Sequence, residues 1–169
     1  MPRRTPSPAP RLRPLWLVAA GLSLAVVLWF TLREDEYVTS SNLTGRNFVP
    51  LRHHLAALRC WLDDCPAADA ALEYLLIDVV GNVLLFVPLG LTFAVASTRD
   101  GRWGRLAAAT LSGFLLSLLI EVVQLAMPSR ASDVDDVIFN TVGTLAGAAV
   151  GVILFRRAPA PSRRKPRRG

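Results

Sequence analysis

The sequence predicts an all-α membrane protein, a bundle of four transmembrane helices with an extracytoplasmic amphipathic helix between the first and the second. The chain has 169 residues, 52% of them hydrophobic, and a mean hydropathy of +0.39. Crossing a bilayer takes about 20 apolar residues, and four stretches come close to or exceed that length: residues 15–32, 75–96, 106–127 and 137–155. A soluble helical protein would have too little polar sequence to cover four such helices.

The distribution of charge predicts the orientation. Most of the 19 Lys and Arg residues lie in segments 1–14, 97–105 and 156–169, whereas most acidic residues lie in the two segments that alternate with these. The positive-inside rule therefore places both termini and the 97–105 loop of a multi-pass membrane protein in the cytoplasm. A net charge of +6 also raises nucleic acid as a partner, but the clustering beside the spans favours contact with membrane lipids instead.

The two ends of the chain and the first apolar run set the domain limits. Residues 1–14 and 156–169, rich in Pro and Arg, are expected to be disordered basic cytoplasmic tails, which leaves 15–155 as the membrane domain. A basic region before an apolar run resembles a secretory signal. This run is longer than a signal core and no small-residue cleavage site follows it, so we expect an uncleaved first span.

The segment between the first two spans contains an amphipathic pattern. Apolar residues recur at spacings of three and four, which is typical of a helix that lies on a membrane or caps a bundle: Phe48, Leu51, Leu55, Leu58 and Leu62. His53 and His54 lie within it, but adjacent helical residues point in different directions. A shared metal ion is therefore not expected, and no other pattern indicates a metal or a cofactor.

Cys60 and Cys65 are the only cysteines, and both lie in this segment. On an extracytoplasmic side a disulfide would persist. Residues five apart on a continuous helix are too distant to be bridged, so a bond requires a turn at 63–64. The sequence leaves a disulfide and two free thiols equally open.

Proline and glycine mark the packing of the later spans. Pro88 removes a backbone donor and should kink the second span. Gly143, Gly147 and Gly151 form two overlapping GxxxG patterns, which permit close helix contact. That contact lies either within one bundle or between copies in a homo-oligomer.

Polar side chains on three spans are expected at one depth. Asp78 and Asn82 are four apart and share a face. With a rise of about 1.5 Å per residue, the polar groups of the second, third and fourth spans all fall near the extracytoplasmic boundary. Because such groups are costly in a membrane, they indicate a functional site. The predicted pocket comprises Asp78, Asn82, Glu121, Gln124, Arg130, Asp133, Asp136 and Asn140.

Each member of this set also has a purely structural interpretation. The groups would then only satisfy one another, and Asp133 and Asp135 would favour the start of the fourth span through its helix dipole. Arg130 is the cation available to pair with a carboxylate or to bind an anionic ligand through its planar fork.

Four motifs resemble the VanZ-like family of small membrane proteins. They are NFVPLR (47–52), D-x3-N-V-L-L-F-V-P-L-G (78–90), I-E-x2-Q (120–124) and SRASDVDDVIFNTVGTLAG (129–147). They occur in the family's order and cover roughly residues 45–150. The resemblance implies a link to low-level resistance to glycopeptides such as teicoplanin, without a settled mechanism.

Three functions compete at this point. The first is binding or modification of a cell-envelope amphiphile, such as a lipid-linked cell-wall intermediate or a lipoglycopeptide. The second is an intramembrane enzyme acting on a lipid head group with Glu121 and Asp136 as acid and base. No nucleophile beside a His, phosphate loop or metal motif supports it. The third is a small oligomeric proton-coupled transporter, although the polar groups stop at the outer half.

Overall fold

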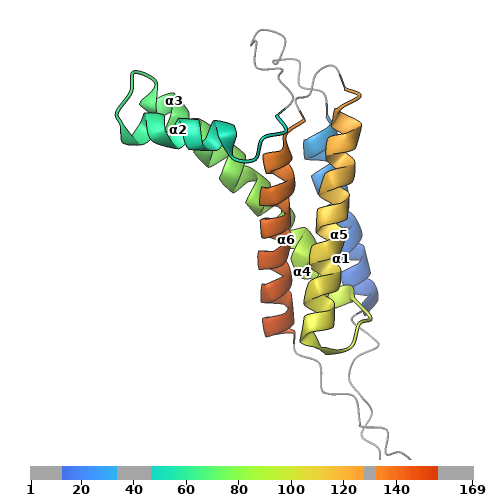
Figure 1. The fold of residues 1–169 in the computed structure, drawn as a ribbon. Helices are drawn as coiled ribbons and strands as arrows, with labels where there is room; N and C mark the ends of the chain where they lie inside the picture. The colour runs from blue at the N-terminus through green and yellow to red at the C-terminus, as the bar shows by residue number, and fades with distance from the viewer. Residues whose placement is uncertain (1–12, 34–46, 128–131, 156–169) are drawn as a thin grey trace, which may run out of the picture.

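The computed structural model describes residues 13–33, 47–127 and 132–155, which form helices and short connections (Figure 1). Four helices are long and apolar enough to cross a membrane, which confirms the predicted fold class. The helices, in chain order, are α1 (Arg13–Leu32), α2 (Arg52–Leu62), α3 (Ala68–Leu75), α4 (Gly81–Ala96), α5 (Gly101–Gln124) and α6 (Val134–Leu154). Within these described ranges no β-strand forms.

Four helices form the bundle and a helical hairpin leaves it. Helix α4 packs against α1, α5 and α6, and α5 also packs against α6. The α2–α3 hairpin projects sideways from the end of the bundle at which α6 begins (Figure 1). We call this end the acidic end, because Asp78, Asp133, Asp135 and Asp136 lie there, and we call the opposite end, with the α4–α5 connection, the Arg105 end.

The helix limits differ from the predicted spans. Helices α3 and α4 are joined by a π-helical turn, Leu76–Val80, into one continuous helix of 29 residues, Ala68–Ala96. The predicted span starts at 75 because Asp69 and Glu73 lie in the first two turns of this helix. The helix that contains most of the predicted third span is Gly101–Gln124, and the helix that contains most of the predicted fourth span begins at Val134.

The fourth span begins early because Asp133 caps it. The Asp133 carboxylate accepts a hydrogen bond from the backbone N–H of Asp135 at 2.8 Å, which satisfies one of the unpaired donors of a helix start.

Helix α2 covers only Arg52–Leu62 of the predicted amphipathic segment. Its extracytoplasmic placement stays a prediction.

Glycines allow α4 and α6 to approach backbone to backbone. A Cβ at Gly143 or Gly147 would lie within 3 Å of a carbonyl oxygen, that of Val83 or Val87 respectively. Only a residue without a side chain fits there. The GxxxG glycines therefore pack inside one bundle, and nothing in these contacts requires a second copy.

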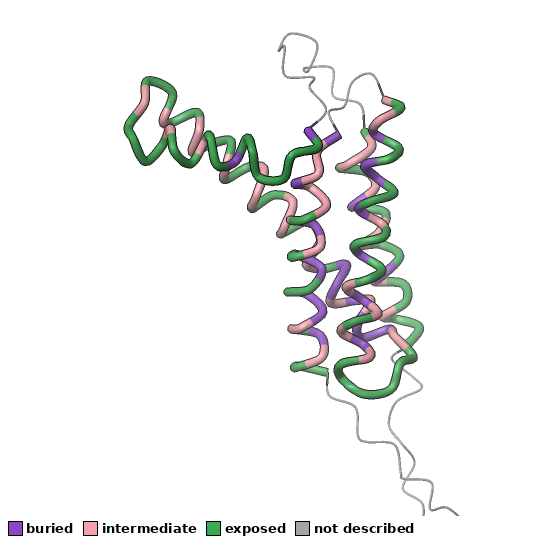
Figure 2. Tube along the Cα trace, in the orientation of Figure 1, coloured by how far each residue is buried: buried purple, intermediate pink, exposed green. Residues whose placement is uncertain are grey.

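The interior of the bundle contains small apolar clusters. Val27, Phe86, Leu89 and Ile120 form one between α1, α4 and α5. Helix α4 continues through Pro88 to Ala96. Buried positions follow the bundle helices, whereas the α2–α3 hairpin is mostly exposed (Figure 2). In a membrane protein, exposed apolar helix faces are those available to lipid.

Arg105 closes its end of the bundle by binding backbone carbonyls. Its side chain is buried, with 3% of its surface exposed. Its Nε donates to the oxygen of Ala94 at 2.8 Å, Nη1 to that of Phe155 at 3.0 Å and Nη2 to that of Gly151 at 3.4 Å. These carbonyls belong to the C-terminal ends of α4 and α6, where a cation is favourable. Arg105 thus joins three helices.

Candidate functional site

The acidic end is built around a backbone contact between two distant segments. Asn47 and Asp133 form an isolated parallel bridge. The N–H of Asn47 donates to the oxygen of Ser132 at 3.0 Å, and the N–H of Val134 donates to the oxygen of Asn47 at 3.0 Å. The Asn47 side chain donates to Asp133 Oδ1 at 2.9 Å. The segment before α2 is thereby attached to the start of α6.

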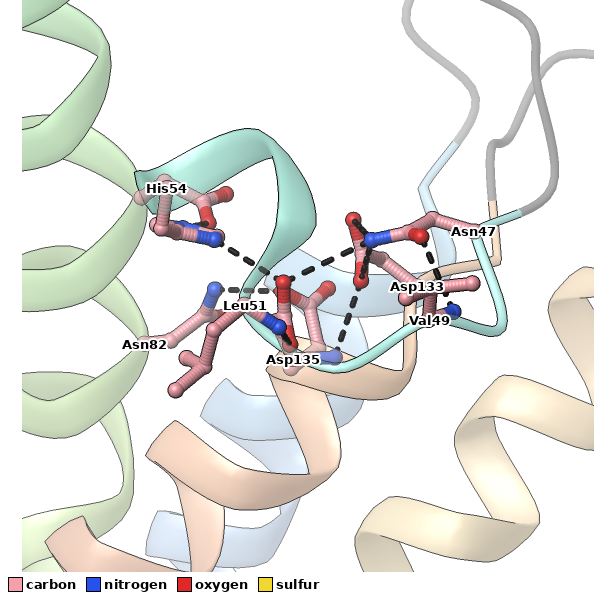
Figure 3. A network of polar contacts seen from close by, with 9 residues as sticks. Asn47, Val49, Leu51, His54, Asn82, Asp133 and Asp135 are labelled. Carbon is pink, nitrogen blue, oxygen red and sulfur yellow. Dashed lines mark hydrogen bonds and ion pairs between the residues drawn. The ribbon is translucent and has the colours of Figure 1, made fainter. Parts of the chain in front are cut away.

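Asp135 is the buried centre of the site (Figure 3). One carboxylate oxygen accepts the N–H of Leu51 at 2.6 Å, and the other lies 2.9 Å from Nδ1 of His54 and 3.4 Å from Nδ2 of Asn47. Leu51 adopts φ 60°, a conformation rare for a residue with a bulky side chain. We attribute it to the requirement that its N–H point at Asp135.

His54 connects three helical segments. Its Nε2 lies 2.7 Å from Oδ2 of Asp78, so its two ring nitrogens face carboxylates from two different spans. Both nitrogens donate in the imidazolium form, whereas a neutral ring donates from only one. Tyr74 and Phe139 pack against the ring, with centroids at 5.2 and 4.9 Å. These contacts hold the hairpin on α6.

Two further carboxylates, Asp136 and Glu121, lie nearby, and each is bonded to different residues. Asp136 Oδ1 accepts a hydrogen bond from Nδ2 of Asn82 at 2.8 Å, which links α6 to α4. Glu121 accepts the hydroxyl of Ser132 and the N–H of Asp133, both at 2.8 Å. Glu121 therefore holds the connection that precedes α6. Within the described residues no hydrogen bond joins Glu121 to Asp136, the two residues considered as an acid–base pair.

Gln124 and Asn140 serve other contacts. Gln124 donates to the oxygen of Thr31 on α1 at 2.9 Å, and Asn140 donates to the hydroxyl of Ser117 on α5 at 2.9 Å. Both amides are buried, and their oxygens have no hydrogen-bond partner among the described residues. In the part of the chain that is described, no hydrogen bond connects either residue to Asp78 or Asp136.

Burial divides the acidic end into two sets. Asn47, His54 and Asp135 are buried, and each contacts at least two protein groups. Asp78, Asn82, Asp133 and Asp136 are half-buried. The first set can position the second, and only the second presents oxygen and amide atoms to a ligand. Arg130 lies outside the described residues.

The sequence did not single out His54 or Asp135 as members of the site. His54 was considered only as a metal ligand beside His53, and Asp135 only as a favourable charge at a helix start. Their contacts join residues 81 and 24 positions apart along the chain, so no local spacing reveals them. Asn47 belonged to the NFVPLR motif, which was the available signal. Among the described residues no three His, Cys, Asp or Glu side chains converge as metal ligands.

Cys60 and Cys65 are joined in a disulfide that closes the turn between α2 and α3. The N–H of Cys65 donates to the oxygen of Cys60 at 2.9 Å, and Asp64 adopts φ 50° in the same turn. This is the turn that a bond between residues five apart requires. The disulfide lies at the far tip of the hairpin, away from His54.

Comparisons with known proteins add an independent result. Residues 17–156 match the family model described as VanZ/LLP1. Protein VanZ of Enterococcus faecium is 34% identical over 70 residues, an alignment that covers 41% of this chain and 41% of that relative. The chain thus aligns with less than half of the relative's length. No solved structure matches.

Proposed function

The chain belongs to the VanZ/LLP1 family, and we propose that it binds or modifies a cell-envelope amphiphile at the acidic end of its bundle. The ligand class is a lipid-linked cell-wall intermediate or a lipoglycopeptide of the teicoplanin type. The site would face the outside of a bacterial plasma membrane, with both termini in the cytoplasm. Sensitivity to glycopeptides would change as a consequence of that binding.

One observation carries the proposal. Three half-buried polar side chains come from two different spans: Asp78 and Asn82 from one, and Asp136 from the other. Asn82 donates a hydrogen bond to Asp136, which joins the two spans. They lie in helices that are otherwise apolar enough to cross a membrane. Polar groups kept at such depth are costly unless they have a function.

The chemistry of these groups favours a ligand rich in hydrogen-bond donors. Carboxylates accept hydrogen bonds, and an amide both accepts and donates them. Sugar hydroxyls and the amide or amino groups of a peptide match this set. A bare phosphate would be repelled by Asp78 and Asp136, so an anionic part of the ligand would need a cation such as Arg130.

The neighbouring hairpin suits the apolar part of an amphiphile. Helix α2 leaves four large apolar side chains exposed, namely Leu55, Leu58, Trp61 and Leu62. A helix of this kind lies in the membrane interface with its apolar face toward the acyl chains. His54 attaches the hairpin next to Asp78, so polar and apolar parts of one ligand would find adjacent surfaces.

Substitution of Asp136 by Asn tests the proposal. Asp136→Asn keeps the size of the side chain and removes a charged acceptor, which should weaken binding about 10-fold, as for a hydrogen bond to a charged group. Thermal stabilisation of the purified protein by teicoplanin and by a polyprenyl-linked disaccharide peptide gives the affinity. A deletion strain complemented with each variant gives the teicoplanin sensitivity.

Asp69→Asn is the matched control, because Asp69 is an exposed acid on α3 outside the network. It should leave affinity and sensitivity unchanged. The proposal fails if neither compound stabilises the wild-type protein, or if Asp136→Asn and Asp69→Asn behave alike although both fold.

Acid–base chemistry on a bound head group is the second candidate. The observation that favours it is His54 between Asp78 and Asp135, with Asp78 half-buried at the surface of the site. In this version Asp78 and Asp136 face the substrate, and Glu121, occupied by Ser132 and Asp133, does not. A variant that binds the ligand as wild type does but loses the phenotype, for example Asp78→Asn, would separate this candidate from binding alone.

A further inference from the structure

A cavity of about 350 Å³ opens at the Arg105 end of the bundle, far along the helices from the acidic end. It lies between the start of α1, the end of α4 and the first half of α5. Leu17, Phe93 and Ala109 contribute apolar walls, and Arg13 and Arg99 lie in its lining. Its volume is within the range of ligand clefts, roughly 300–1,000 Å³.

The two arginines make the rim of this cavity positive. Both are exposed, and neither forms an ion pair with an acid among the described residues. Asp100 follows Arg99 directly but is not part of the lining. The backbone of Arg99 is held by a hydrogen bond from its N–H to the hydroxyl of Ser97 at 3.2 Å. Two exposed cations in a largely apolar lining match an anionic head group and an acyl chain.

The Arg105 end also carries the basic residues that predict the cytoplasmic side. Anionic phospholipids lie in the leaflet at that surface, and basic pockets between transmembrane helices recognise their head groups. Arginine suits a phosphate because its planar fork donates two parallel hydrogen bonds. The apolar lining, the two arginines and the position at the predicted cytoplasmic side therefore all favour an anionic phospholipid.

We propose that this cavity binds one anionic phospholipid, with its phosphate between Arg13 and Arg99 and one acyl chain along Leu17 and Phe93. The lipid would contact both α1 and the α4–α5 connection, because residues of both line the cavity. This site is separate from the amphiphile site at the acidic end, and its occupancy does not depend on that function.

Lipid binding to the full-length protein tests the inference. The protein, purified in mild detergent, is titrated with phosphatidylglycerol or phosphatidylcholine, and bound lipid is counted by native mass spectrometry. A basic residue near a membrane surface contributes about a five-fold change in affinity for anionic lipid. Arg13→Gln and Arg99→Gln should each weaken phosphatidylglycerol binding ~5-fold, and the double variant should weaken it more than either single variant does.

Arg102→Gln is the charge-matched control, since Arg102 lies at the same end, over the ring of Trp103, and does not line the cavity. It should change the affinity less than about two-fold. Ala108→Leu keeps both arginines and narrows the slot. It should reduce binding of long-chain phosphatidylglycerol while leaving the dihexanoyl form unaffected.

Three results would overturn the proposal. Equal loss with Arg102→Gln would show that only net charge matters. Equal binding of phosphatidylcholine would remove the role of the anionic head group. Displacement of the lipid by inorganic phosphate at the same concentration would indicate an ion site without an acyl slot.

Discussion

The two ends of the bundle are held together by opposite chemistry. At the acidic end, side chains bind side chains: His54 lies between Asp78 and Asp135, and Asn82 binds Asp136. At the Arg105 end, one buried guanidinium binds three backbone carbonyls. The first arrangement depends on the identity of several side chains, whereas the second depends on one guanidinium and on backbone carbonyls, which any residue at those positions would supply.

We therefore assign a structural role to the Arg105 clamp and a ligand-binding role to the acidic end. The Arg105 clamp is one buried side chain bound to backbone carbonyls, and it is separate from the cavity that Arg13 and Arg99 line at the same end. The acidic end uses buried residues to position half-buried ones, which is the arrangement expected of a site. If this comparison is right, substitution of Arg105 should lower stability alone, whereas substitutions at the acidic end should also change ligand binding.

The largest expected effect comes from removing the clamp. Arg105→Ala removes the hydrogen bonds to the carbonyl oxygens of Ala94, Gly151 and Phe155, at about 1 kcal/mol or more each, and opens a gap between three helices. We expect about 4 kcal/mol less stability, measured as a lower unfolding midpoint in detergent, while any protein that folds still binds ligand at the acidic end.

Arg105→Lys sharpens this prediction. A lysine keeps the charge but cannot span three acceptors with a rigid fork. It should therefore recover less than half of the lost stability. Full recovery by lysine would mean that charge alone closes this end, and the contrast with the acidic end would weaken.

The next effect is expected from His54. His54→Ala leaves buried Asp135 and half-buried Asp78 without their shared partner, which should cost about 2 kcal/mol. Unlike the loss of Arg105, it should also free the hairpin, seen as faster hydrogen exchange over residues 52–75, and weaken ligand binding.

His53 supplies the control for this prediction, because it is the adjacent residue and its side chain is exposed. His53→Ala should change neither stability nor exchange. A His54→Ala protein with the wild-type midpoint and exchange pattern would show that the Asp78–His54–Asp135 contacts do not hold the hairpin.

The smallest effect is expected from the disulfide. It closes a loop of only five residues, so the chain-entropy model gives at most about 2 kcal/mol, confined to the hairpin. Cys60→Ser with Cys65→Ser should raise exchange near residues 60–65 and leave the bundle midpoint nearly unchanged. Two alkylatable thiols in protein kept without reductant would contradict the bond itself.

The class of fold and the number of apolar helices long enough to span a membrane follow from the amino-acid sequence alone. Apolar runs of bilayer length can form only helices in hydrocarbon, because every backbone polar group must be satisfied within the segment. The glycine spacing also indicated a close helix contact, and the polar residues of three spans were expected at one end. These are properties of composition and local periodicity, which a chain carries before it folds.

Which polar groups contact one another depends on how the helices pack. Glu121 and Asp136 looked alike in sequence, yet one binds the connection before α6 and the other binds Asn82. His54 reaches Asp135 because the hairpin folds back on α6, and Arg105 reaches two C-terminal helix ends because the bundle brings them together. Pairings between residues far apart in the chain depend on helix tilt, rotation and the path of the connections, and none of these is encoded in local spacing.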